Sequence, residues 1–207
     1  MATNWPSSVQ TFTNPTSGSS LSSPSHADQH ATVNDTVEAL QNYAGLVLVK
    51  SVTIGSGVSS VTVTNAFDAR YDSNRIVIDI DQSGADGAFR LQLGSTTTGY
   101  YGGHYGYRWT GASYSEIKNN GSQPVIGASG GGRGGFSVID INDAHKTDLT
   151  AWRGNWTYRR ISSGLGAFGF CGGIVDNSTS YTSFTLAVDS TTMTGGTIRV
   201  YGYNNGA

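Results

Sequence analysis

The chain has 207 residues, which is enough for one substantial domain and an appendage but short for two full domains. Charged residues make up only 13% of it and the formal net charge is −2, which excludes the strongly basic surface of a nucleic-acid-binding protein. The single cysteine, Cys171, excludes an intramolecular disulfide and a multi-cysteine metal site, and its apolar neighbours predict a buried thiol.

The first six residues, Met1 to Pro6, have neither the basic start nor the apolar run of a signal peptide. No stretch of the sequence reaches the roughly 18 apolar residues that a membrane span requires. We therefore expect a chain that is made in a cytoplasm and does not insert into a membrane.

Residues 1–25 are rich in serine, threonine and proline and carry few large apolar side chains. Such a segment cannot bury enough apolar surface to fold alone, so it is either a disordered tail or an extended arm that orders against a partner. We favour the arm, because the isolated Trp5 and Phe12, with Val9 between them, resemble anchors that fill pockets on another protein.

A short helix is predicted over residues 26–44, with 26–45 as the linker segment. Ser25 can cap its N-terminus, with Asp28 three residues further on, and Gly45 suits the left-handed position that ends a helix. Within it, steps of 4, 3, 4, 3 and 4 join one stripe of residues: His26, His30, Val33, Val37, Leu40 and Ala44.

The narrow stripe is of the kind that seams a coiled coil, and a helix of this length is marginal in water without a partner. That partner is either the chain's own β-domain or the same helix in sister subunits. We favour self-association through Val33, Val37, Leu40 and Ala44, because packing on a β-domain would call for a wider apolar face. The two histidines are either solvated at the helix start or stacked around a symmetry axis as an ion site; we assign them no metal.

From residue 46 onward the apolar residues alternate, and glycine, with 29 copies, punctuates the chain. Ten strand-like runs follow: 46–54, 58–63, 75–81, 88–93, 105–110, 136–141, 149–158, 167–171, 184–188 and 197–203. The first two, separated by a Gly-Ser-Gly turn, are predicted to pair as a hairpin. Ten short strands without intervening helices predict a mainly β domain over residues 46–207, an antiparallel β-sandwich of jelly-roll type.

Two stretches resemble a known class of proteins. Residues 26–45 resemble the short linker helix near the N-terminus of bacteriophage fibre and tail-appendage proteins. Residues 181–203, which end on Gly-Thr-Ile-Arg-Val-Tyr-Gly, resemble the closing strands of the β-sandwich domains in such proteins, and residues 136–147 resemble the strand and turn before them. The segment from Ser95 to Gly135 does not align and is expected to be a loop-rich insertion.

The resemblance implies a virion structural protein, a homotrimer whose N-terminal arm docks on a capsid or tail protein through Trp5, Val9 and Phe12. It also implies that the β-domain faces the host. We expect no enzymatic activity and no cofactor, because the sequence offers few residues for a catalytic set. Two other hypotheses stay open: a host-glycan-binding module that acts as the receptor-binding protein, or a capsid decoration subunit. A small depolymerase is a further alternative.

Candidates for catalysis are few. Asp79 and Asp81 share one face of a strand, and Asp140, Asp143 and His145 lie close together near a turn; paired carboxylates or an oxygen-ligated cation site could be built from them. Aspartates that cap turns explain the same pattern. The glycine-rich run 129–135 precedes a strand and not a helix, so we predict a tight or flexible turn whose amides could bind an anionic sugar group.

Aromatic residues cluster around residues 100–114: Tyr100, Tyr101, Tyr105, Tyr107, Trp109 and Tyr114. Tyrosine and tryptophan present flat apolar faces with a polar edge, which suits stacking on sugar rings and also suits protein interfaces. These residues are therefore candidates for glycan binding. The alternative is that Tyr105, Tyr107 and Trp109 form the inward face of a strand, as we expect for the core or subunit-interface residues Trp152, Trp156 and Tyr158.

Overall fold

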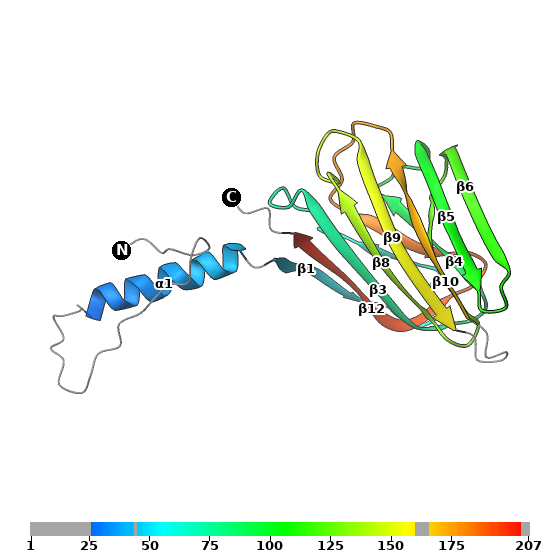
Figure 1. The fold of residues 1–207 in the computed structure, drawn as a ribbon, viewed down its shortest axis with the longest axis horizontal. Helices are drawn as coiled ribbons and strands as arrows, with labels where there is room; N and C mark the ends of the chain where they lie inside the picture. Colours follow the sequence, from blue (N-terminus) through cyan, green and yellow to red (C-terminus); the bar gives the residue numbers. More distant parts are fainter. Residues whose placement is uncertain (1–25, 44, 160–165, 204–207) are drawn as a thin grey trace. The chain divides into compact units, whose positions relative to one another are not determined.

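The computed structural model describes residues 26–43, 45–159 and 166–203 (Figure 1). The chain forms two compact units, one with helix α1 (His26–Tyr43) and one with the β-domain, which runs from Val47 to Tyr203. The predicted arm, with its anchors Trp5, Val9 and Phe12, lies outside the described residues, and so does Ala44.

Helix α1 covers the predicted span to within a residue at its C-terminal end. The Thr32 and Thr36 hydroxyls donate to the carbonyl oxygens of Asp28 and Thr32 at 2.8 Å, so these two hydroxyls are satisfied within the helix. The seam residues Val33, Val37 and Leu40 are 46%, 47% and 47% exposed. An apolar stripe is thus present on α1 with about half of each side chain in contact with solvent.

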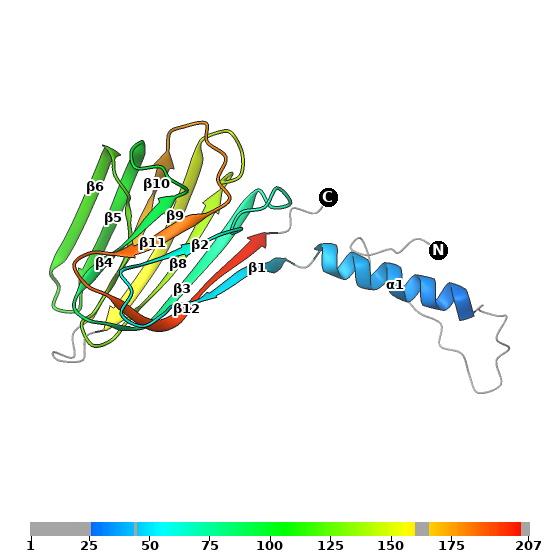
Figure 2. The same cartoon turned by 180° about the vertical axis from the view of Figure 1, so that it is seen from behind.

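The β-domain consists of two sheets (Figures 1 and 2). The larger has eight strands in the order β1-β12-β3-β8-β9-β10-β5-β6, and the smaller has four in the order β2-β11-β4-β7. Their bounds are β1 (Leu46–Thr53), β2 (Ser60–Val63), β3 (Ser73–Ser83), β4 (Gly87–Leu93), β5 (Tyr100–Arg108), β6 (Ser113–Gly121), β7 (Val125–Ser129), β8 (Gly135–Asn142), β9 (Thr150–Arg159), β10 (Gly166–Val175), β11 (Phe184–Val188) and β12 (Met193–Tyr203).

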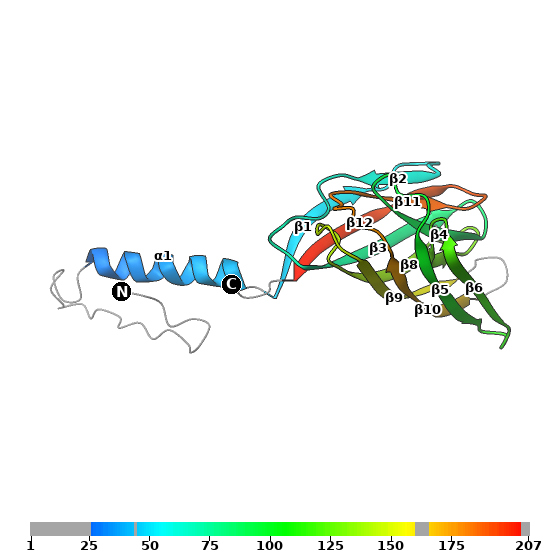
Figure 3. The ribbon, with the colours of Figure 1, turned by 90° about the horizontal axis from the view of Figure 1, so that it is seen from above.

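The core lies between the two sheets, which Figure 3 shows as two layers. Alternate residues of each strand point to opposite faces, and most of those directed inward are apolar, although Asn74 of β3 and Ser137 of β8 are also buried. In β3 the buried apolar residues are Ile76, Ile78 and Ile80, and they belong to the same core cluster as Phe89 and Leu91 of β4. The small sheet therefore covers the inner face of the large sheet, while the opposite face of the large sheet is the outer one.

The predicted fold class is confirmed, because the domain is a mainly β sandwich of two antiparallel sheets preceded by one short helix. The predicted hairpin is wrong. β1 lies beside β12 in the large sheet, and β2 pairs with β11 in the small sheet. The Gly-Ser-Gly turn at residues 55–57 leads the chain from one sheet to the other, so each strand finds its partner far away in sequence.

The expectation of a loop-rich insertion from Ser95 to Gly135 is also wrong. This segment contains strands β5, β6 and β7. β6 has the sequence Ser-Tyr-Ser-Glu-Ile-Lys-Asn-Asn-Gly, which has little intrinsic preference for a strand. It is a strand because it pairs antiparallel with β5 along the edge of the large sheet.

Candidate functional site

Four aromatic side chains stand together on the outer face of the large sheet. In the antiparallel pair of β5 and β10, Tyr105 lies opposite Phe170 and Tyr107 opposite Phe168. All four are between 42% and 63% exposed. We call these residues the outer aromatic face. Exposed aromatic side chains in adjacent register positions are unusual on a solvated sheet, which makes this face a candidate binding surface.

The local sequence explains how this face forms. Tyr105-Gly106-Tyr107 and Phe168-Gly169-Phe170 each alternate an aromatic residue with glycine, so the aromatic rings point outward and the glycines inward. A Cβ on either glycine would come within 2.7 Å of the Trp156 ring. The glycines are therefore required for the buried indole to lie flat beneath the two strands.

The rings of the outer aromatic face contact one another. Tyr105 and Tyr107 meet edge to face with centroids 5.1 Å apart, and the Tyr105 hydroxyl donates to the Tyr107 hydroxyl at 2.7 Å. This hydrogen bond raises the pKa of Tyr107 above its ordinary value. The ring centroids of Tyr107 and Phe168 are 6.3 Å apart. The two hydroxyls thus form a fixed polar edge beside an apolar surface.

Polar side chains border the aromatic rings on the next strand. Asn155 of β9 lies opposite Phe170, and Thr157 lies opposite Phe168. Both are exposed on the same outer face, and so is Arg153 two residues before Asn155. A surface that combines flat apolar rings with hydroxyl, amide and guanidinium groups matches the chemistry of a saccharide, which has apolar C–H faces and polar hydroxyls.

The structure corrects one residue of the predicted glycan site. Tyr100 is completely buried: its hydroxyl accepts from the backbone N–H of Leu93 at 2.9 Å and donates to the carbonyl of Thr96 at 3.2 Å. Burial raises the pKa of Tyr100 to about 12. Alternation along β5 explains this orientation: Tyr105 points outward, so Tyr100, five positions away, points inward. Tyr100 is therefore a core residue and cannot touch a glycan.

The other predicted aromatic residues differ in their exposure. Tyr105, Tyr107 and Trp109 are exposed, so the alternative that they form the inward face of a strand is wrong. Tyr101 is half-buried, and the side chain of Tyr114 lies outside the described residues. Trp152, Trp156 and Tyr158 were predicted to share one face as core or subunit-interface residues, and their burial shows that they are core residues.

Phe168 and Phe170 were not predicted as site residues. The prediction of a buried Cys171 is confirmed, since the residue is 6% exposed and burial raises the pKa of its thiol to about 12. Strand alternation places Phe170 and Phe168 on the face opposite Cys171, so the inward cysteine was the signal that these two phenylalanines point outward.

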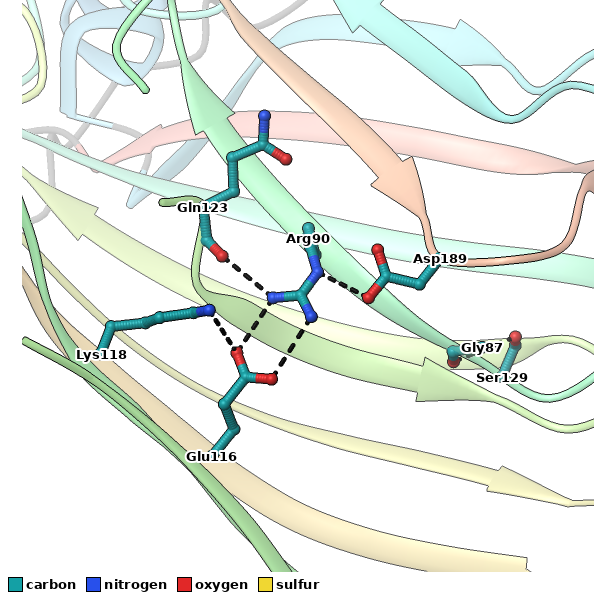
Figure 4. Close-up of polar contacts among 7 residues, drawn as sticks. All are labelled: Gly87, Arg90, Glu116, Lys118, Gln123, Ser129 and Asp189. Carbon is teal, nitrogen blue, oxygen red and sulfur yellow. Dashed lines mark hydrogen bonds and ion pairs between the residues drawn. The ribbon is translucent and has the colours of Figure 1, made fainter. Parts of the chain in front are cut away.

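A second polar cluster joins the two sheets at their β4–β6 side (Figure 4). The Arg90 guanidinium of β4 donates to both carboxylate oxygens of Glu116 on β6, at 3.0 and 3.3 Å, and to Asp189 at 2.6 Å. It also donates to the Gln123 carbonyl, and Lys118 lies 3.1 Å from Glu116. These bonds lower the pKa of Glu116 to about 2, chiefly through Arg90.

A cleft of about 330 Å³ lies next to this cluster and is lined in part by His104, Glu116 and Tyr158. Burial lowers the pKa of His104 below its ordinary value, so its ring is neutral at pH 7. The Glu116 carboxylate at the cleft wall is already engaged by Arg90 and Lys118. We therefore interpret the Arg90 cluster as a structural bridge between the sheets.

The candidate acids near residue 140 also form structural ion pairs. Asp140 accepts two hydrogen bonds from Arg75, at 2.8 and 3.1 Å, and one from the Tyr203 hydroxyl at 2.7 Å. Asp143 lies 2.7 Å from the Lys146 ammonium. These contacts agree with the interpretation that the aspartates stabilise turns and strand pairs.

The glycine-rich run forms a tight turn, as predicted, but its amides do not form an anion cradle. The backbone N–H groups of Gly132 and Gly134 donate to the carbonyl oxygens of Ser83 and Asp81, at 2.8 and 3.0 Å. The N–H of Gly131 donates to the Asp86 carboxylate at 2.9 Å. Three of these amides therefore already bind strand β3 and its turn, which argues against the predicted binding of an anionic sugar group.

Within the described part of the chain, no helix is long and apolar enough to cross a membrane. The same residues contain no group of three or more histidine, cysteine, aspartate or glutamate side chains that could hold a metal ion. The chain matches no protein-family model, and no curated protein matches it in sequence. Its function must therefore be argued from its own surfaces.

Proposed function

We propose that the chain is a non-enzymatic structural subunit of a bacteriophage fibre, which docks on the virion by residues 1–25 and displays its β-domain for attachment to the host surface. The observation that carries the proposal is the outer aromatic face, because four exposed rings in register on one sheet form a surface suited to binding. The acids Asp140, Asp143 and Glu116 are engaged in ion pairs, which favours a structural role for them.

Helix α1 supports the homotrimeric part of the proposal. Val33, Val37 and Leu40 keep nearly half their surface exposed on one stripe of the helix. Burying such a stripe against two copies of itself would remove apolar surface from water without any rearrangement of the β-domain. Three β-domains would then be displayed together on one stalk.

The direct test is incorporation into particles. A chain without residues 1–25 is expected to remain a soluble trimer but to be absent from purified virions, measured by immunoblot against the full chain. Incorporation of the truncated chain at the normal level would refute the attachment arm. Immunogold labelling of intact virions then separates a fibre from a capsid decoration subunit by the position of the label.

A second candidate function, compatible with the first, is recognition of a host-surface glycan. The paired hydroxyls of Tyr105 and Tyr107, together with the neighbouring Asn155 and Thr157, favour it. A sugar ring presents both an apolar face and hydroxyls, so it can use the aromatic rings and this ordered polar edge together.

Glycan binding is tested with Tyr105→Ala and Phe170→Ala. Each variant removes one ring of the outer aromatic face and is expected to weaken binding to host polysaccharide about tenfold, since one stacked ring contributes roughly 1–2 kcal/mol. Leu149→Ala serves as a control, because Leu149 is exposed outside this face. Unchanged binding by both aromatic variants would exclude the outer aromatic face as the glycan site.

A further inference from the structure

A pocket of about 380 Å³ opens at the end of the outer sheet face, and three features that are far apart in sequence meet there. They are Trp109, which follows β5; Arg133, in the turn between β7 and β8; and the carboxylates of Asp79 and Asp81 on β3. Phe136 and Thr157 complete its lining on β8 and β9. The volume lies within the range of pockets that bind small ligands.

The pocket is continuous with the outer aromatic face. In the large sheet, Phe168 lies opposite Thr157, Thr157 opposite Phe136, and Phe136 opposite Asp79. These four residues form one row across β10, β9, β8 and β3. Tyr107 precedes them in the same row on β5. A chain molecule that binds along this row would reach the pocket without leaving the sheet.

Backbone hydrogen bonds fix the parts of the pocket. The N–H of Trp109 donates to the Gly166 carbonyl at 2.9 Å, and the indole lies against Gly166 with half of its surface (54%) still exposed. The N–H of Arg133 donates to the Gly130 carbonyl at 3.0 Å, and Gly134 donates to Asp81 of β3 at 3.0 Å. The pocket is therefore formed in the free protein.

Its charged groups are available to a ligand. Across residues 26–43, 45–159 and 166–203, no ion pair or side-chain hydrogen bond involves Asp79, Asp81 or Arg133, in contrast to the paired Arg90, Asp140 and Lys146. All three of these side chains are exposed. The pocket thus offers two carboxylates that accept hydrogen bonds and one guanidinium that donates them, beside two exposed aromatic rings.

We propose that this pocket binds one neutral sugar ring of a host-surface polysaccharide, with Trp109 and Phe136 against its C–H face and Asp79, Asp81 and Arg133 on its hydroxyls. The two carboxylates outnumber the one guanidinium, so an acidic sugar would be repelled where a neutral one is held by charge-assisted hydrogen bonds. The inference rests on the glycan-recognition function proposed above and adds the sugar class and the subsite.

The test compares binding of the full chain to neutral and to uronic-acid-containing host polysaccharides by biolayer interferometry. Trp109→Ala and Asp79→Asn are each expected to weaken neutral-polysaccharide binding about tenfold, the size of one lost stacking or charged hydrogen-bond contact. Asp79→Asn/Asp81→Asn is expected to gain binding to the acidic polysaccharide. Asp148→Asn, an exposed carboxylate elsewhere, is the matched control and should change neither. Thermal unfolding of each variant verifies that it is folded.

Binding of the pocket variants at the unmodified level, with loss in Tyr105→Ala, would overturn the pocket and leave the glycan function standing. A chain that binds neither polysaccharide but still enters virions would overturn the glycan function and this inference while leaving the fibre role intact. Measurements are repeated with a calcium chelator: retained binding supports direct contact of the carboxylates with hydroxyls, and loss of binding would overturn it in favour of a bridging cation.

Discussion

Arg90 is the residue on which the closure of the sandwich at its β4–β6 side depends. Its guanidinium is mostly buried and bonds to partners from three segments: Glu116, Asp189 and the carbonyl of Gln123. A buried cation without partners would be costly, so each partner stabilises the others by keeping Arg90 satisfied. The cluster therefore links the small sheet to the edge strand β6.

Glu116→Gln tests this link through pH. The folded-state pKa of Glu116 is about 2, below its ordinary value of 4.5, so its carboxylate stabilises the fold above about pH 4.5 and ceases to do so as the pH falls towards 2. We expect the variant to be less stable by about 1–2 kcal/mol at pH 7, a value reduced because a third of the side chain is exposed. The difference should shrink between pH 4.5 and 2, measured by urea unfolding.

Asp68→Asn is the matched control, because Asp68 pairs with Arg70 only two residues away and both side chains are exposed. Its effect at pH 7 should be much smaller than that of Glu116→Gln. Equal destabilisation by the two variants, or a Glu116→Gln effect that does not change with pH, would contradict the role assigned to the Arg90 cluster.

Residue types alone predicted part of the candidate site. Tyr105, Tyr107 and Trp109 were identified because tyrosine and tryptophan present flat apolar faces with a polar edge, which suits stacking on sugar rings. Tyr100 was assigned wrongly because the predicted strand began at residue 105, whereas β5 begins at Tyr100 and its alternation turns that side chain inward. The charged side of the pocket was not predicted as a unit, because Asp79 and Arg133 meet only through the pairing of β3 with β8.

At the scale of elements, α1 gives the clearest prediction. Val37→Asp places a charge on the exposed apolar stripe, where a trimer would have to bury it. We expect the trimer dissociation constant to rise at least about a hundredfold, measured by sedimentation equilibrium, because a buried unpaired charge costs several kcal/mol. Asn34→Asp adds the same charge off the stripe and should leave the trimer intact.

A Val37→Asp chain that stays trimeric at the same concentration would show that the β-domain holds the subunits together. The helix would then be only a connector between the arm and the β-domain.

Other elements show where local sequence is sufficient and where it is not. The helix and the strongly alternating strands β3 and β11 were predicted at nearly their observed positions, because their periodicity is set by residues they contain. β6 was missed because its polar residues are held in a strand by β5. The false hairpin of β1 and β2 had a suitable turn, but in the structure the two strands join different sheets.

For the whole molecule, composition and turn spacing were enough to predict a β-sandwich, but not which strand belongs to which sheet. That assignment depends on pairings between distant segments, such as β1 with β12 and β5 with β10. The local sequence of a short strand does not specify its pairing partner, because the other strands have a similar composition. One strand order is selected only when the apolar faces of all the strands are buried together.

The strand order also determines how the domain would carry mechanical load. β1, which follows the helix directly in the chain, lies at one edge of the large sheet, and β5, with Tyr105 and Tyr107, lies six positions away towards the other edge. A pull between an anchored helix and a ligand on β5 would cross the sheet from strand to strand through its backbone hydrogen bonds. The hydrogen bonds between β1 and β12 would bear that force first. We therefore expect β1 to separate from the sheet before the distant binding surface on β5 is disrupted.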